Sequence, residues 1–567
     1  MLLELPASAH TTLEWSWERW YPFYAALEAA PITDPAAWLA AWSQVADVLA
    51  ETYTRLLVAT TRDTTDSAAD SRFRAFLADV YPRALAADQA LKRKFLATGV
   101  EPEGFAVPLR NLRAEAELFR EANLPLLTEE QGLGNEYNRI IGAQTIEWAG
   151  RELTIPQTEP LLEDPDRTTR EEVWRRAAAR QLADREAINR IWRQLLALRR
   201  QLAANADLPD YRAYAWRLRQ RFDYAPDDCL RFHEAIEAVA VPAARRVYAR
   251  RAARLGLARL RPWDTHARAP HEAPLRPFRD GADLAERGEA VLMRVDAELG
   301  GYFATLRREG FLDLDNRKGK APGGYCAYFP VARRPFIFMN AVGLPGDVRT
   351  LLHEAGHAFH DFEMARLPYH RQREAPIEFA EVASMAMELL AAPYLRRSDG
   401  GYYDPAEYAR ARIEHLEGML TFWPYMAVVD GFQHWAYTNP EVADDPATCD
   451  AAWDRLWARF MDGVDWSGLD AERMTGWHRK QHIYRYPFYY VEYGLAQLGA
   501  VQVWRNALRD QAGAVAAYRR ALALGGTVPL PDLFHAAGAR FAFDTTVLRE
   551  AVELIEEVID TLERAEG

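Results

Sequence analysis

Apolar residues recur along most of this chain at intervals of three and four positions, the spacing that gathers them on one face of a helix. Two long stretches show the pattern well, DPAAWLAAWSQVADVLAETYTRLLVA (34–59) and TTREEVWRRAAARQLADREAINRIWRQLLALRRQLAANA (168–206). Proline and glycine separate such stretches without forming low-complexity tracts. The pattern predicts a mainly α-helical protein.

Strand signal is concentrated in one segment, GGYCAYFPVARRPFIFMN (323–340). Two runs of aromatic and β-branched residues flank the short connection VARRP, as in a β-hairpin. We therefore expect a small hairpin within the helical fold. The turn-rich stretch ANADLPDYRAY (204–214) is the cue for a division of the chain near residue 200.

Composition restricts the class of protein. The chain has 567 residues, of which 49% are hydrophobic and 27% charged, an ordinary balance for a globular protein with a large core. Its net charge of −13 argues against general nucleic-acid binding, which needs a basic face. The three cysteines, Cys229, Cys326 and Cys449, are far apart and lack C-x-x-C spacing. That distribution argues against a disulfide framework and against a thiolate zinc cluster.

Neither a leader nor a membrane anchor is indicated. The stretch MLLELPASAHTTLEWSWERW (1–20) has neither the basic region nor the apolar core of a signal peptide. Nowhere does the chain approach the roughly 18 uninterrupted apolar residues that a membrane span requires. We therefore expect a cytoplasmic protein.

The segment LLHEAGHAFH (351–360) holds three histidines and one glutamate within eight residues. The residues before it, GLPGDVRTLL, predict a helix that starts at about Val348, with Asp347 as its N-cap. This helix would end at about Arg366, because Pro368 follows.

His353 and His357 lie four residues apart and therefore face the same side of this helix. Two neutral imidazoles in this arrangement suit zinc, and the neighbouring Glu354 suits a general base that activates water. The motif also occurs by chance, and a histidine on an apolar helix is more often a packed core residue. A third ligand has to decide between these two interpretations.

A second helix is predicted in APIEFAEVASMAMELLAAPYL (375–395). On it Glu381, Ser384 and Glu388 share one face, and Glu378 lies on the same side. A carboxylate on that face would complete a site of two histidines and one glutamate, with an open position for water. Spacing alone leaves Glu378 and Glu381 as alternatives.

The two motifs together resemble a known family. HEAGHAFH followed by EFAEVASMAMELL closely resembles the oligoendopeptidase F branch of the thimet oligopeptidase family of zinc metallopeptidases, and is similar to bacterial enzymes that cleave collagen-derived peptides. In that family the third zinc ligand is the glutamate of F-x-E-V-x-S, which corresponds to Glu381. Three further segments resemble the family, NRKGKAPGGYCAYFP (316–330), PFIFMN (335–340) and HIYRYPFYYVEYGLAQLGA (482–500).

The resemblance covers about residues 316–500. It implies one zinc ion per chain, oligopeptide substrates, and two helical lobes around a deep central channel. With the cue near residue 200, it predicts an N-terminal lobe over 1–200 and a catalytic zinc-peptidase lobe over 201–567. The small hairpin is expected next to the zinc helix.

The tyrosine-rich segment predicts a second part of the site. A helix starting around Pro487 would present the phenols of Tyr486, Tyr490 and Tyr493 on one face. A phenol there can donate to the oxyanion of a tetrahedral intermediate. In the family, one histidine and two tyrosines of this motif bind substrate and stabilise the transition state. These roles correspond to His482, Tyr490 and Tyr493, with Tyr486 as a further substrate-binding residue.

The remaining aromatic residues of this segment fit a different interpretation, a stripe of core side chains. We expect Tyr484 and Tyr489 to be packed in the core. Cys326 is likewise interpreted as a packed residue, and His360 as either a packed residue or a hydrogen-bonding neighbour of the metal ligands.

The hairpin offers a strand edge with which the backbone of an extended peptide can pair. Gly323 and Gly324 allow that backbone to approach closely, and Tyr325 follows them. We expect these three residues to bind substrate, and the alternative is a structural hairpin that covers the zinc helix.

The imidazoles of metal ligands usually form a second hydrogen bond with a protein group. The candidates for this role are Asp361, Glu378 and Ser384.

These features predict a zinc-dependent endopeptidase that cuts short unstructured peptides. Two alternatives stay open, a zinc exopeptidase of the dipeptidyl carboxypeptidase type and a non-catalytic, metal-stabilised peptide-binding protein. Glu354 argues against the second alternative, because a structural metal site needs no base. The sequence does not indicate an oligomeric state.

Overall fold

The computed structural model describes residues 5–269 and 272–566, so the first four residues of the stretch tested for a leader lie outside it. Helix predominates, and the prediction of a mainly α-helical protein is confirmed. The α-helices are α1 (Trp17–Ala29), α2 (Pro35–Arg62), α3 (Ser67–Ala75), α4 (Tyr81–Leu96), α5 (Ala106–Leu118), α6 (Asn123–Gly142), α7 (Glu159–Leu162), α8 (Arg167–Ala183), α9 (Arg185–Asn205), α10 (Tyr211–Leu218), α11 (Pro226–Arg254), α12 (Gly281–Val295), α13 (Ala297–Glu309), α14 (Pro345–Met364), α15 (Ile377–Ala391), α16 (Pro405–Thr438), α17 (Pro440–Ala443), α18 (Pro446–Phe460), α19 (Asp470–Met474), α20 (Gln481–Arg485), α21 (Tyr490–Ala507), α22 (Gln511–Leu522), α23 (Leu530–Ala536) and α24 (Thr545–Glu566).

The predicted hairpin is present and belongs to a three-stranded sheet. Strand β4 (Tyr325–Phe329) pairs antiparallel with β5 (Arg334–Ala341), with Cys326 opposite Ile337. A strand that the sequence interpretation missed, β3 (Leu312–Asp315), pairs parallel with the other side of β5. The order β3-β5-β4 therefore leaves β4 at an edge of the sheet.

A second, two-stranded hairpin was also missed. It joins β1 (Thr145–Trp148) to β2 (Arg151–Thr154) through Ala149 and Gly150. Both connecting residues have positive φ, 49° and 75°, as a tight two-residue turn requires.

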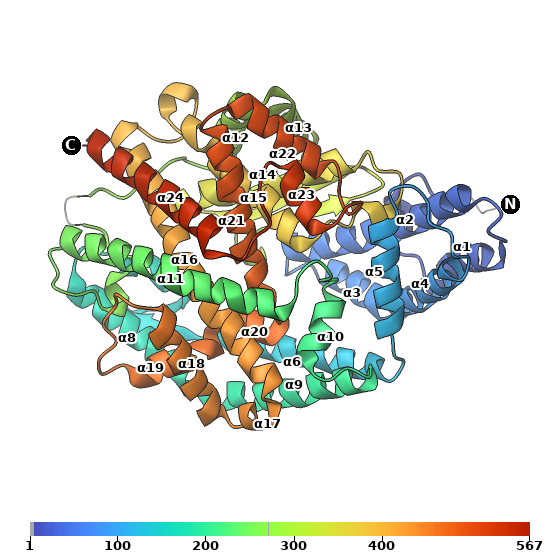
Figure 1. Ribbon diagram of the computed structural model, residues 1–567, viewed down its shortest axis with the longest axis horizontal. Helices are drawn as coiled ribbons and strands as arrows, with labels where there is room; N and C mark the ends of the chain where they lie inside the picture. The colour runs from blue at the N-terminus through green and yellow to red at the C-terminus, as the bar shows by residue number, and fades with distance from the viewer. Residues whose placement is uncertain (1–4, 270–271, 567) are drawn as a thin grey trace.

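The helical stretch at 168–206 is two helices, because the backbone leaves the helical conformation at Asp184 between α8 and α9. Residue 200 lies inside α9, and the turn-rich stretch lies just after it, where α9 ends at Asn205 and α10 begins at Tyr211. The N-terminal helices do have a core of their own, formed by Trp20, Trp38, Phe95 and neighbours between residues 20 and 112. Figure 1 shows α1 to α5 grouped at the end of the molecule that carries the N-terminus.

Most of the remaining helices share one large core, which extends from Leu118 to Ile559. Within it α15 packs against both α14 and α21, and α11 packs along α16. None of the helices in the described part of the chain is both long and apolar enough to cross a bilayer.

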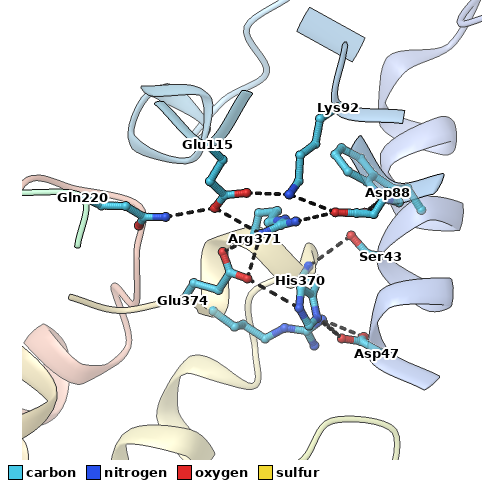
Figure 2. A network of polar contacts seen from close by, with 11 residues as sticks. Ser43, Asp47, Asp88, Lys92, Glu115, Gln220, His370, Arg371 and Glu374 are labelled. Carbon is cyan, nitrogen blue, oxygen red and sulfur yellow. Dashed lines mark hydrogen bonds and ion pairs between the residues drawn. The ribbon is translucent and has the colours of Figure 1, made fainter. Parts of the chain in front are cut away.

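The connection between α14 and α15 is tied to the N-terminal helices by a network of charged side chains (Figure 2). Arg371 lies 3.0 Å from Asp88 of α4 and 3.1 Å from Glu374. Lys92 bridges Asp88 and Glu115 at 3.0 and 2.6 Å. These ion pairs hold the segment between the two helices that carry the candidate metal ligands.

The same connection has a second anchor on α2. The imidazole of His370, to which the sequence interpretation gave no role, lies 2.7 Å from Asp47 through Nδ1. Arg373 pairs with the same carboxylate at 2.7 Å. The position of the connection therefore depends on long-range pairs that local sequence patterns do not indicate.

Candidate metal centre

The helix that carries the histidine motif starts before the predicted position. Pro345 occupies its first position, which suits a residue without an N–H group. Asp347 is the third residue of the helix, so the prediction that it is the N-cap is wrong. Its carboxylate still caps the helix, because it accepts hydrogen bonds from the N–H groups of Val342 and Leu344 at 2.9 and 2.8 Å.

A glycine inside the motif brings the two ligand helices together. A Cβ atom at Gly356 would lie 2.5 Å from the carbonyl oxygen of Ala383 and 2.6 Å from Cα of Ser384. Only glycine allows α14 to lie this close to α15. The histidines of α14 therefore face the glutamates of α15 at short range.

His353, His357 and Glu381, the predicted metal ligands, converge at one place. One ligand atom from each lies within 4.8 Å of the other two. Nε2 of His353 is 3.3 Å from Oε2 of Glu381, and Nε2 of His357 is 3.8 Å from the same oxygen. Both imidazoles are 23% exposed, so a solute can reach them.

Glu388 orients the first imidazole, a role that the sequence interpretation did not give it. Its Oε1 lies 2.8 Å from Nδ1 of His353, and its Oε2 lies 3.1 Å from Nε2 of His415 in α16. Because a carboxylate can only accept, Nδ1 of His353 carries the proton and Nε2 is left for a metal. The signal in the sequence was the position of Glu388 on the same helix face as Glu381.

The three residues expected to bond the imidazoles have other partners. Ser384 donates to Glu381 at 3.1 Å. Asp361 faces Cys326, whose Sγ lies 3.7 Å away. These expectations are wrong because helical spacing gives the face of a helix but not the neighbour that lies against it.

Glu378 had been expected to bond an imidazole and was also the alternative third ligand. It accepts a hydrogen bond of 2.6 Å from the phenol of Tyr224 and lies 3.6 Å from Arg221. The carboxylate is therefore engaged away from the two histidines.

The charge state of the centre follows from burial and from its neighbours. Burial raises the pKa of Glu354 to about 7, and the nearby His353 opposes this shift. Burial also lowers the pKa of His357 to about 4, which keeps the imidazole neutral. For His353 burial alone would lower the pKa, but Glu381 and Glu388 outweigh it and raise the pKa.

The tyrosine segment departs from the predicted helix. Helix α21 begins at Tyr490, and Phe488 has a φ of +62°, so the backbone before it is irregular. Tyr486 directly follows α20, is 43% exposed and does not continue the row formed by Tyr490 and Tyr493. The prediction of three phenols on one helix face is wrong for Tyr486.

The irregular turn brings a different tyrosine to the centre. The phenol of Tyr489, which was expected to lie in the core, donates to Oε1 of Glu381 at 3.1 Å. The ring of Tyr493 lies 5.1 Å from the ring of Tyr489. Tyr484 is fully buried, as expected for a core residue.

His482 lies beside the predicted tyrosines. Its ring centroid is 4.9 Å from Tyr490 and 5.9 Å from Tyr493. Burial lowers its pKa to about 4, so the imidazole is neutral. The phenol of Tyr490 accepts a hydrogen bond of 3.0 Å from Lys480.

These side chains line a cavity of about 450 Å³ next to the candidate centre. Glu388 and His415 form its wall on the metal side, and Met385, Met419 and Phe422 contribute apolar surface. His482, Tyr490 and Tyr493 complete its lining.

The start of strand β4 borders the candidate base. A Cβ atom at Gly324 would lie 3.8 Å from Oε1 of Glu354, and Gly323 has a φ of +100°. The phenol of Tyr325 instead bonds to Thr61 of α2 at 2.5 Å. The Tyr325 side chain therefore joins the sheet to the N-terminal helices, and only its backbone remains for the predicted contact with substrate.

Comparison with known proteins gives consistent matches. The sequence model of Peptidase family M3 matches residues 160–286 and 297–553. The chain is 25% identical over 288 residues to oligopeptidase PepF of Bacillus subtilis (strain 168), an alignment that spans 49% of this chain and 41% of that relative. A structure of Pz peptidase A with an inhibitor has a TM-score of 0.86 and 25% identity, covering 99% of this chain and 98% of that one. A structure assigned as oligoendopeptidase F gives a TM-score of 0.86 and 25% identity over 98% of both chains.

Proposed function

The chain belongs to peptidase family M3, and from that premise we propose that it is a zinc-dependent endopeptidase acting on short unstructured oligopeptides. One observation carries the proposal. His353, His357 and Glu381 present ligand atoms within 4.8 Å of one another, beside the buried carboxylate of Glu354.

The donor set fits zinc. Two imidazole nitrogens and one carboxylate oxygen are the ligands of many catalytic zinc sites, and they leave a position open. Glu388 supports the fit, because it holds Nδ1 of His353 and leaves Nε2 for the ion. When bound, zinc supplies Lewis-acid chemistry, which makes water more acidic and polarises a carbonyl group.

In the proposed mechanism Glu354 moves the proton. Its carboxylate takes a proton from the attacking water and later delivers it to the nitrogen of the leaving amine. Its side chain is buried on α14, which limits the access of competing water to this proton.

Phenols and one imidazole stabilise the developing oxyanion. Tyr493 donates a hydrogen bond to the carbonyl oxygen as it gains charge, with Tyr490 or His482 assisting. Tyr489 orients Glu381 through the hydrogen bond between its phenol and Oε1. Tyr486 is left as a peripheral contact for substrate.

Substrate backbone would lie along the edge of β4. This edge begins at Gly323 and Gly324, and the backbone of Tyr325 continues it. Pairing through main-chain groups explains how one site accepts many peptide sequences. The central channel and the two lobes, 1–200 and 201–567, are part of the same proposal and would exclude folded proteins.

The test is cleavage of an internally quenched peptide of about ten residues, blocked at both ends, with chelator treatment and zinc re-addition. Internal cuts that the chelator abolishes and zinc restores are the expected result. Cleavage only of peptides with a free terminus would show that the protein is an exopeptidase and not an endopeptidase. Binding of the peptide without cleavage would show that the protein is a non-catalytic peptide-binding protein.

A further inference from the structure

A second group of side chains of the types that bind metals lies on α11 and α16, the two long helices that pack along each other. Cys229 and His233 are four residues apart on α11, and Asp430 and His434 are four residues apart on α16. Each pair therefore presents both side chains on one helix face. The group shares no residue with the candidate catalytic centre.

The side chains of this group converge from the two helices. One ligand atom each from Cys229, Asp430 and His434 lies within 4.8 Å of the other two. Nε2 of His434 lies 3.2 Å from Oδ2 of Asp430. His233 Nε2 is 2.9 Å from the same oxygen and holds the carboxylate in place.

Two polar atoms of the group have neither a hydrogen-bond nor an ion-pair partner among the described residues. They are Oδ1 of Asp430 and Nδ1 of His434, whose Nε2 instead faces Oδ2 of Asp430. Asp430 is fully buried and His434 is 4% exposed. Buried polar atoms are rarely left unpaired in native proteins, so these atoms indicate a missing partner.

We propose that Cys229, Asp430 and His434 bind a divalent transition-metal ion of the zinc type, which clamps α11 to α16. Binding releases the proton of the Cys229 thiol and forms one sulfur–metal bond. The resulting thiolate and the carboxylate of Asp430 together balance the two positive charges of the ion, as a buried site requires. Sulfur and imidazole ligands favour zinc over magnesium or calcium.

The clamp also adjoins the tyrosine segment. The ring of Phe488 lies 5.3 Å from the ring of His434, and the Phe488 N–H donates to Oε1 of Gln433 at 2.7 Å. Phe488 is the residue whose positive φ sets the turn before α21. An ion at Asp430 and His434 therefore stiffens the base of the segment that carries Tyr489.

The test is a metal count together with a cobalt spectrum on the full chain. Metal ions per chain are measured by mass spectrometry for the natural protein, for the double variant His353→Ala/His357→Ala and for Cys229→Ser. Cys449→Ser is the matched control, because Cys449 is equally buried and its thiol donates to the carbonyl of Ala443. Protein refolded with cobalt(II) is examined for the near-ultraviolet absorption that only thiolate-ligated cobalt shows.

The expected result is one ion fewer in Cys229→Ser than in the control, and one ion retained in the double histidine variant. The thiolate–cobalt band should be present in the natural protein and in the control, and should be lost in Cys229→Ser. Absence of this band in the natural protein, with no ion retained in the double variant, overturns the proposal. Those two measurements decide even if Cys229→Ser does not fold, and they do not depend on peptidase activity.

Discussion

Replacement of Glu388 by glutamine tests how the protein orients its proposed metal ligand. Glu388 receives hydrogen bonds from two imidazoles at once, Nδ1 of His353 at 2.8 Å and Nε2 of His415 at 3.1 Å. Burial alone would raise the pKa of Glu388, but the two histidines outweigh it and hold the pKa at about 2. The carboxylate is therefore charged, and each of its oxygens accepts one of these bonds.

A glutamine at this position keeps the size but not the two acceptors. Its amide group offers one oxygen, so one imidazole faces an N–H₂ group and loses its partner. The negative charge that makes His353 a stronger ligand is also lost. Loss of such a partner costs about 10- to 100-fold in metal affinity, which corresponds to about 1.4–2.7 kcal/mol.

The assay is a competition titration of zinc between the protein and a chelating indicator. Glu363→Gln is the matched control, because Glu363 is a buried carboxylate on α14 that pairs with Arg519 at 2.8 Å and contacts no ligand imidazole. We expect Glu388→Gln to weaken zinc binding, the control to bind as the natural protein does, and excess zinc to restore turnover of the variant. Equal zinc affinity in Glu388→Gln and the natural protein would show that Glu388 does not support His353 as a ligand.

Three further predictions concern the oxyanion contact, the anchoring network and the helix contact. Tyr493→Phe should lower kcat by about 10²- to 10³-fold with little change in KM, whereas Tyr484→Phe, whose phenol has no described partner, should leave both constants unchanged. Arg371→Met should lower the free energy of unfolding by about 1–3 kcal/mol in denaturant titrations, because Asp88 and Glu115 keep only Lys92 as their cation and Glu374 loses its guanidinium partner. Burial alone would raise the pKa of Asp88, but Arg371 and Lys92 outweigh it and lower it. The stabilisation is therefore present above pH of about 4 and is lost as the pH falls further. If the free energy of unfolding of the variant falls below about pH 4 as steeply as that of the natural protein, this prediction is wrong. Gly356→Ala should separate α14 from α15 and lower both the melting temperature and the bound zinc, and normal zinc content would contradict the close contact.

The parts of the fold that depend on local pattern could be predicted from the sequence. Apolar residues at helical spacing indicated that the chain is mainly α-helical, and two aromatic-rich runs indicated the hairpin of β4 and β5. The ligand helix was predicted within a few residues, but its start was misplaced because Asp347 reaches back to cap from the third position. A capping side chain indicates that a helix begins nearby, but it does not identify the first residue of the helix.

The parts that depend on long-range packing could not be predicted. The bond from Tyr489 to Glu381 requires the positive φ of Phe488, which no local pattern indicates in a residue other than glycine. The group around Cys229 and Asp430 requires two helices from distant parts of the chain to pack together. The spacing within each helix indicates which of its residues share a face. It does not indicate which other helix lies against that face.

We propose that Glu354 moves the proton at a metal site formed by His353, His357 and Glu381. Bound zinc and turnover of a doubly blocked peptide, measured together in Glu354→Gln, test this role. Zinc content and melting temperature should stay as in the natural protein while kcat falls by about 10²- to 10⁴-fold. Turnover at the natural rate with zinc bound would contradict it.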